Sequence, residues 1–258
     1  MRFSALDKWL GAAAGLGAFA VALVVLAPAT LIDARLQRAS DGRLRLAEAS
    51  GSLWSGAGWI EIRDSDGRAG VARSLAWRVL PESLLRGRLV AEVELDQAAR
   101  PFRVSLSLSR IEIADAGINL PASALGLGVP KLAPFRLTGD VLVNIPHLSF
   151  ERERMDGEAT LQWRAAGSAL TPISPLGEYE VRFKAAGPEL HAALSTLEGP
   201  LQLDGQGTWS NGAAPVFAAT ARVPPQQQEQ LAPLFRLIAV EHGAGVFDLK
   251  LKQDPLGP

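Results

Sequence analysis

The stretch LAWRVLPESLLRGRLVAEVEL, residues 75–95, decides the fold. Apolar side chains occupy every second position on both sides of a central PESLLRG segment; they are Leu75, Trp77 and Val79 before it and Leu89, Ala91, Val93 and Leu95 after it. A period of two is typical of a strand with one buried face. The central segment opens on Pro81 and closes on Gly87, which predicts a single helical turn. The stretch therefore predicts two strands joined by a short turn.

The same period returns along most of the chain. Its apolar members are Phe102, Val104, Leu106 and Leu108; Phe135, Leu137, Val141 and Val143; Leu161 and Trp163; Tyr179, Val181 and Phe183; and Leu201 and Leu203. Turn-forming residues lie between these runs, in DSDG (64–67), MDG (155–157), TPISPLG (171–177) and LEGP (197–200). We therefore expect a mainly β fold of roughly ten to fourteen strands, in an elongated or partly rolled antiparallel sheet.

One longer helix is expected near the C-terminus. The segment PPQQQEQLAPLFRLIAVEHG, residues 224–243, begins with two prolines and ends at a glycine. Its apolar residues Leu231, Leu234, Phe235 and Ile238 stand at helical spacing. A last strand, GVFDLKL (245–251), is expected to follow.

The N-terminal segment has a different character. Residues 9–32 carry no charge and are numerous enough to cross a bilayer as a helix, and Arg2 and Lys8 precede them. The basic start predicts a cytoplasmic segment (1–8), a transmembrane signal anchor (9–32) and an exported, periplasmic β-rich domain (33–258). A signal peptide cleaved after Ala29 and a buried soluble helix are the alternatives. Gly11 and Gly15 form a GxxxG pair, which permits helix pairing but is also common in anchors.

Composition and motifs argue against several classes of function. The 258-residue chain has a net charge of -1, so no nucleic-acid partner is expected, and it has no cysteine. His147, His191 and His242 are isolated from one another, and no metal-binding motif occurs. Ser52 and Ser55 lie among glycines but do not form the GxSxG pattern of a serine nucleophile. We therefore expect no enzyme, no catalytic residue, no metal and no cofactor.

The stretch SGSLWSG, residues 50–56, is predicted to be a structural corner between two strands. Gly51 and Gly56 permit sharp bends or close approach of the backbone. Leu53 and Trp54 are expected to turn toward the apolar face and fix the corner.

Two phrases now suggest a family. ASGSLWSGAGWIEI (49–62) and the 75–95 stretch, placed after an N-terminal anchor, resemble the type II secretion system protein N family of Gram-negative bacteria. The signature positions are Gly51, Leu53, Trp54, Ser55, Gly56, Trp77, Pro81, Leu84, Gly87 and Leu89. The resemblance implies a single-pass inner-membrane protein with a periplasmic β-rich domain and no enzymatic activity. It also implies a role in assembly or bridging between inner-membrane components and the outer-membrane secretin.

A second resemblance leaves an alternative open. Anchored, exported sheets with an apolar face are similar to AsmA-like proteins, which carry lipid along a β groove. A filled sandwich, a closed barrel and an open groove all share the period-two pattern, so the sequence does not separate them. Lipid is therefore the alternative ligand.

Overall fold

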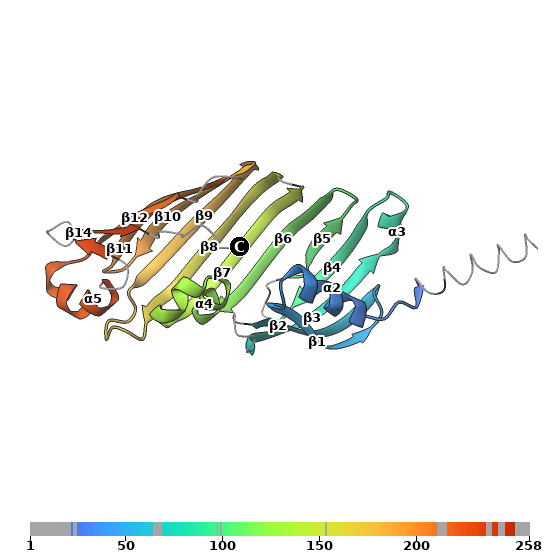
Figure 1. The fold of residues 1–258 in the computed structure, drawn as a ribbon, viewed down its shortest axis with the longest axis horizontal. Coiled ribbons are helices and arrows are strands. Elements are labelled where there is room, and N and C mark those ends of the chain that lie inside the picture. Colours follow the sequence, from blue (N-terminus) through green and yellow to red (C-terminus); the bar gives the residue numbers. More distant parts are fainter. Residues whose placement is uncertain are drawn as a thin grey trace, which may run out of the picture.

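The computed structural model describes residues 22, 25–63, 69–96, 98, 100–152, 154–210, 216–235, 239–241 and 246–250. Their strands form one sheet of 14 strands (Figure 1). The strands are β1 (Leu44–Gly51), β2 (Ser55–Arg63), β3 (Ala69–Leu80), β4 (Leu89–Leu95), β5 (Phe102–Leu106), β6 (Arg110–Pro121), β7 (Leu137–Glu151), β8 (Arg154–Ser168), β9 (Gly177–Gly187), β10 (Glu189–Glu198), β11 (Gln202–Ser210), β12 (Val216–Arg222), β13 (Ala239–Glu241) and β14 (Val246–Lys250).

The order of the strands in the sheet follows the sequence almost throughout. From β1 to β12, consecutive strands pair antiparallel. β12 then pairs with β14, and β14 pairs with β13. The described sheet is therefore open, with β1 at one edge and β13 at the other. The predicted mainly β, antiparallel and elongated architecture is confirmed, and the closed-barrel alternative is not what the described strands form.

Strand register brings the apolar residues together on one face. Val143 in β7 pairs with Leu161 in β8, Leu161 pairs with Val181 in β9, and Val181 pairs with Leu194 in β10. Because directly paired residues of antiparallel strands point to the same face, these four side chains form one continuous row. The period-two pattern in the sequence therefore becomes an apolar face that runs across the sheet.

Helical segments join the strands at both borders of the sheet. They are α2 (Thr30–Ala39), α3 (Pro81–Leu84), η1 (Ala122–Ala124), α4 (Leu125–Gly128), η2 (Pro130–Phe135), η3 (Pro225–Gln227) and α5 (Gln228–Phe235). In Figure 1, α2, α4 and α5 lie toward the lower border of the sheet, which we call the lower rim. The opposite border, with α3 and the turns at residues 107–109, 152 and 188, is the upper rim.

Two buried clusters pack at the helical segments. The larger contains Phe135, Leu176, Leu201, Ala221, Val223 and Leu231, and the smaller contains Ala29, Leu46 and Trp77. Tyr179 lies beside the larger cluster. Its hydroxyl donates to the carbonyl oxygens of two cluster members, Leu176 and Leu201, at 3.2 and 3.0 Å. Burial raises the pKa of this phenol above its usual value, because the charged form would lose its hydration.

Three local predictions about strands were wrong. The sequence predicts a break at MDG (155–157), but this segment lies inside β8, and the turn falls just before it at Arg152. Leu108 was placed on a buried face, but it sits fully exposed in the β5–β6 turn, where a side chain has no neighbouring strand to pack on. Phe135 ends η2 instead of lying in a strand, and its ring is buried in the larger cluster.

The C-terminal helix is shorter than predicted. Helical structure begins at Pro225 and ends at Phe235, whereas the sequence suggested a helix up to Gly243. Residues 239–241 instead form β13, because pairing with β14 satisfies their backbone groups. The predicted last strand is confirmed as β14 over residues 246–250.

Most of the predicted membrane anchor lies outside the described residues. This applies to Gly11, Gly15 and the segment 1–21, and DSDG (64–67) is outside them as well. Leu31 and Ile32, which were counted in the anchor, belong to the separate helix α2. In the described ranges, no helix has the length and hydrophobicity that a membrane span requires.

Candidate functional site

The SGSLWSG stretch forms the corner between β1 and β2, as predicted. Within it the side chain of Ser52 organises the turn: its Oγ accepts hydrogen bonds from the backbone N–H groups of Trp54 and Ser55 at 3.2 and 3.3 Å. The N–H of Ser52 in turn donates to the carbonyl of Ser55 at 2.9 Å. A short polar side chain that replaces missing backbone partners is what a tight turn requires. Ser52 is thus a turn-forming residue.

Both signature glycines of the corner are required by close packing. Gly51 has a φ of +89°, and a Cβ there would lie 2.5 Å from the carbonyl oxygen of Ser55. A Cβ on Gly56 would lie 2.5 Å from the indole ring of Trp77. Side chains larger than hydrogen therefore do not fit at either position without movement of the backbone or the indole.

Trp77 of β3 ties the corner to the sheet. Its indole N–H donates to the carbonyl of Leu53 at 3.2 Å, and the N–H of Val79 donates to the carbonyl of Trp54 at 2.7 Å. The Trp77 side chain is only 8 % exposed. Leu53 and Trp54 are half-buried, so the indole that fixes the corner is contributed by the second signature phrase. The two phrases, which are separated by residues 63–74 in the sequence, meet here.

The second phrase also forms the predicted turn. Pro81 is the first residue of α3, and Gly87, with a φ of +69°, stands before β4, which starts at Leu89. Leu84 is exposed and contributes little to the core, although the resemblance predicts it as a signature position. Sequence reasoning missed Ser83, whose buried hydroxyl donates to the carbonyl of Leu80 at 2.6 Å and accepts the N–H of Val90 at 3.0 Å. A serine inside a one-turn helix was the available signal.

Helix α2 caps the outer edge of β1. The N–H of Leu46 donates to Oδ1 of Asp33 at 2.8 Å, and the N–H of Leu44 donates to Oγ of Ser40 at 2.9 Å. A bulge at Glu48, with a φ of +52°, further interrupts this edge strand. Unpaired edge groups invite pairing with another chain, and side-chain caps and bulges remove that opportunity. The β1 edge is therefore closed by the protein itself.

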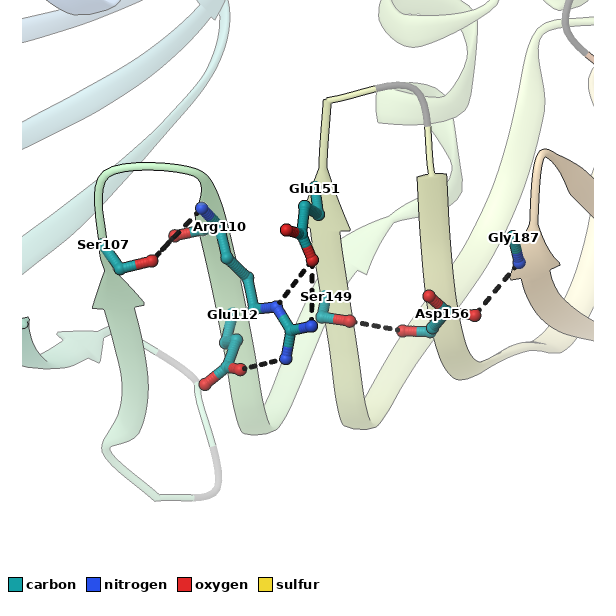
Figure 2. A network of polar contacts seen from close by, with 7 residues as sticks. All are labelled: Ser107, Arg110, Glu112, Ser149, Glu151, Asp156 and Gly187. Atoms are coloured by element: carbon teal, nitrogen blue, oxygen red, sulfur yellow. Dashed lines mark hydrogen bonds and ion pairs between the residues drawn. The ribbon is translucent and has the colours of Figure 1, made fainter.

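A network of polar contacts lies at the upper rim (Figure 2). The guanidinium of Arg110 bonds Glu151 at 2.9 Å and Glu112 at 3.3 Å. The hydrogen bond from Arg110 lowers the pKa of the Glu151 carboxyl, and the two glutamates raise the pKa of Arg110. These groups are solvent-exposed. The network joins β6 to β7 and offers no nucleophile paired with a base.

Two further contacts continue the network toward β9. Ser149 Oγ donates to the carbonyl of Asp156 at 3.2 Å, and the Asp156 carboxylate accepts the N–H of Gly187 at 3.0 Å (Figure 2). They fasten β7, β8 and β9 at the upper rim. Among the residues described, no three His, Cys, Asp or Glu side chains gather in a way that could hold a metal ion.

The histidines stay apart from one another. His147 is exposed on β7, as predicted for a surface residue. His191 is exposed on β10, with Nε2 at 3.3 Å from the carboxylate of Glu189. His242 lies outside the described residues. Where the structure describes them, the histidines therefore have surface positions.

The apolar face is accessible at the upper rim. Leu106 of β5 pairs with Ile111 of β6, Ile111 pairs with Phe150 of β7, and Phe150 pairs with Met155 of β8. Leu106 and Ile111 are 40 % and 45 % exposed. Beside this row lies a cavity of about 260 Å³; Phe150, Met155, Leu190, Trp209, Arg152 and Arg154 are among the residues that line it. The row and the cavity combine apolar surface with two cationic side chains.

Comparison with known protein families gives a match over most of the chain. The family model for the type II secretion system (T2SS), protein N, matches residues 42–250. This range begins two residues before β1 and ends with the last residue of β14, so it covers the whole described sheet. No curated protein and no solved structure matches significantly.

Proposed function

The chain belongs to the type II secretion system protein N family, and from this premise we propose that it is a non-enzymatic interaction protein of the secretion apparatus. The part of the uncharged run that starts at Trp9 and ends before Ala27 would hold it in the inner membrane, with the sheet and α2 in the periplasm. The observation that carries the proposal is the family match over the complete sheet, from β1 to β14. Involvement in type II secretion follows from the family, whereas the assembly or bridging role is our proposal.

The two edges of the open sheet differ in their free backbone groups, and this difference supports a bridging role. Asp33 and Ser40 cap the β1 edge, so a partner strand has no free donors at Leu44 and Leu46. The other edge of the described sheet is β13, whose residues 239–241 pair only with β14 among the described strands. Strand addition needs free backbone groups and uses few specific side chains. A partner from the apparatus would therefore add at the β13 end.

Deletion of the gene is expected to lower secretion of folded periplasmic substrates several-fold, and expression of the full chain should restore it. The tagged full chain should also co-purify with inner-membrane components of the apparatus or with the outer-membrane secretin. Quantitative immunoblots of medium and periplasm, with affinity purification from detergent extracts, measure both effects. Normal secretion together with the absence of apparatus components in the purified material would contradict the proposal.

The exposed apolar row at the upper rim favours a second candidate, a lipid-binding groove of the AsmA-like kind. An acyl chain could lie on Leu106, Ile111 and Phe150, and Arg152 and Arg154 beside the cavity would suit an anionic headgroup. The exposed apolar row crosses β5, β6, β7 and β8, so one acyl chain could lie across several strands.

Native mass spectrometry of the full chain, released from detergent in the presence of membrane phospholipids, tests this second candidate. A lipid bound in a fixed stoichiometry is expected, and Ile111→Asp should abolish it because a carboxylate would replace part of the apolar row. Ala218→Asp, a change at an exposed position of β12, is the matched control and should leave the bound lipid in place. A protein that carries no phospholipid under these conditions would eliminate the groove.

A further inference from the structure

Residues Ala27 to Ala29 lie directly on the SGSLWSG corner. The N–H of Leu53 donates to the carbonyl of Ala27 at 2.8 Å, and the N–H of Ala29 donates to the carbonyl of Gly51 at 3.3 Å. Between these two bonds Pro28 forms an isolated antiparallel bridge with Ser52. The three residues therefore act as a very short strand added to the corner. We call residues 27–29 the exit segment.

The last residue of the exit segment is also buried. Ala29 is 1 % exposed and packs with Leu46 and Trp77, and Ile32 and Leu36 of α2 extend the same cluster. Trp77 therefore has two roles, since the indole that supports the corner also covers Ala29. Both signature phrases converge on the place where the chain enters the sheet.

The described residues just before the exit segment have a helical contact. The N–H of Leu26 donates to the carbonyl of Ala22 at 2.9 Å, as in a helix, and Ala27 is the next residue. Val25 and Leu26 are both exposed in the described structure, and the uncharged run that starts at Trp9 leads directly to them. Apolar side chains that project from a domain in this way suit a hydrocarbon environment.

We propose that the SGSLWSG corner is the docking site for the chain's own exit segment and fixes the sheet rigidly to its membrane helix. This inference rests on the proposed inner-membrane anchoring. The docked residues include Ala29, so the anchor is retained and cleavage after Ala29 does not occur in the working protein. Strand order follows the sequence, so a sheet that extends away from the anchor has β1 nearest the membrane and the later strands progressively farther from it.

The geometry deepens the bridging role. Fourteen strands at their usual spacing span about 60 Å measured across the sheet, so β13 is held far from the membrane end. The closed β1 edge faces the membrane end, and the edge that can accept a partner strand is distant from it. A rigid dock gives the sheet a fixed direction, whereas a flexible linker would let either edge approach the membrane.

Energy transfer between two positions of the sheet and the bilayer tests this orientation. The chain has no cysteine, so Ala57→Cys in β2 and Ala218→Cys in β12 each provide one labelling site at an exposed alanine. The full chain is reconstituted in vesicles of phosphatidylethanolamine and phosphatidylglycerol that carry a headgroup-linked acceptor dye. We expect strong transfer from residue 57 and weak transfer from residue 218.

Two variants test the dock itself. Ala29→Asp places a carboxylate in the buried cluster and should make the two transfer efficiencies converge, whereas Ala72→Asp, at an exposed alanine of β3, should leave them unchanged. Because Ala29→Asp also threatens folding, a second variant inserts six Gly/Ser residues between Leu26 and Ala27. It keeps every contact of the exit segment and should likewise remove the difference, with an unchanged far-UV circular dichroism spectrum.

Equal transfer from the two positions in the unmodified protein would overturn the inference, as would a difference that survives the linker insertion. Carbonate extraction of the same vesicles and of cell membranes separates this result from failure of the proposed function. A chain that stays in the membrane but shows equal energy transfer from residues 57 and 218 contradicts only the rigid docking of the exit segment. A chain that carbonate removes contradicts the anchoring on which the dock depends.

Discussion

Replacement of Trp77 by alanine is expected to lower the free energy of unfolding by about 3–5 kcal/mol, because it removes a large buried side chain and leaves a cavity. Three parts of the protein meet at this indole: the carbonyl of Leu53, the buried methyl group of Ala29 and the glycine backbone at Gly56. Loss of the ring therefore affects the corner, the exit segment and β3 together. Urea unfolding of the detergent-solubilised full chain, followed by circular dichroism, measures the change.

Two companion variants separate the causes. Trp77→Phe keeps most of the apolar contact but loses the indole N–H bond to Leu53, so a smaller loss of about 1–2 kcal/mol is expected. Leu85→Ala, at a position that is 91 % exposed after α3, should change stability by less than about 0.5 kcal/mol. A Trp77→Ala protein as stable as the Leu85→Ala control would show that the indole does not support the corner.

The sequence carried enough information to predict the sheet and the corner. The period of two in 75–95 locates β3 and β4, because a strand with one face buried must alternate in this way. Pro81 and Gly87 mark the turn between them, since each has a backbone preference that acts locally. The corner at 50–56 was predicted on the same grounds, from its glycines.

Features that depend on distant partners could not be predicted. Asp33 and Ser40 have ordinary helix sequences around them, and only the fold brings them to the edge of β1. Phe135 ends a 3-10 helix because its ring meets a cluster built from residues far along the chain. The openness of the sheet is also a tertiary property, because the same alternation serves an open and a closed sheet equally well.

The break predicted at MDG (155–157) shows how glycine can mislead. Gly157 lies inside β8 and pairs with Leu148 of β7, next to a register irregularity between Asn144 and His147. Its φ of +136° suits glycine, so the residue marks a distortion within a long strand and not the end of one. A local rule recognises the special backbone, but the neighbouring strand decides whether the chain turns there.

The same glycine gives the second large prediction: Gly157→Ala is expected to cost about 3 kcal/mol or more in folding free energy. A Cβ at this position would overlap the carbonyl oxygen of His147 and lie 2.9 Å from the Cα of Leu148. Both are backbone atoms of a central strand, which a rotamer change does not relieve. The unfavourable φ adds about 1–3 kcal/mol of strain, and the forced shift of β7 adds a similar amount.

Gly117 in β6 provides the matched control for this prediction. It also lies within a strand, but a Cβ there would meet no atom within 4 Å, and its φ is not positive. Gly117→Ala should therefore be neutral or stabilise the protein by about 0.4–1 kcal/mol, because alanine restricts the unfolded chain more than glycine does. If both variants had the same free energy of unfolding in urea, the backbone of β7 at His147 would be able to move at little cost. Gly157 would then not be required by the close approach of the two strands.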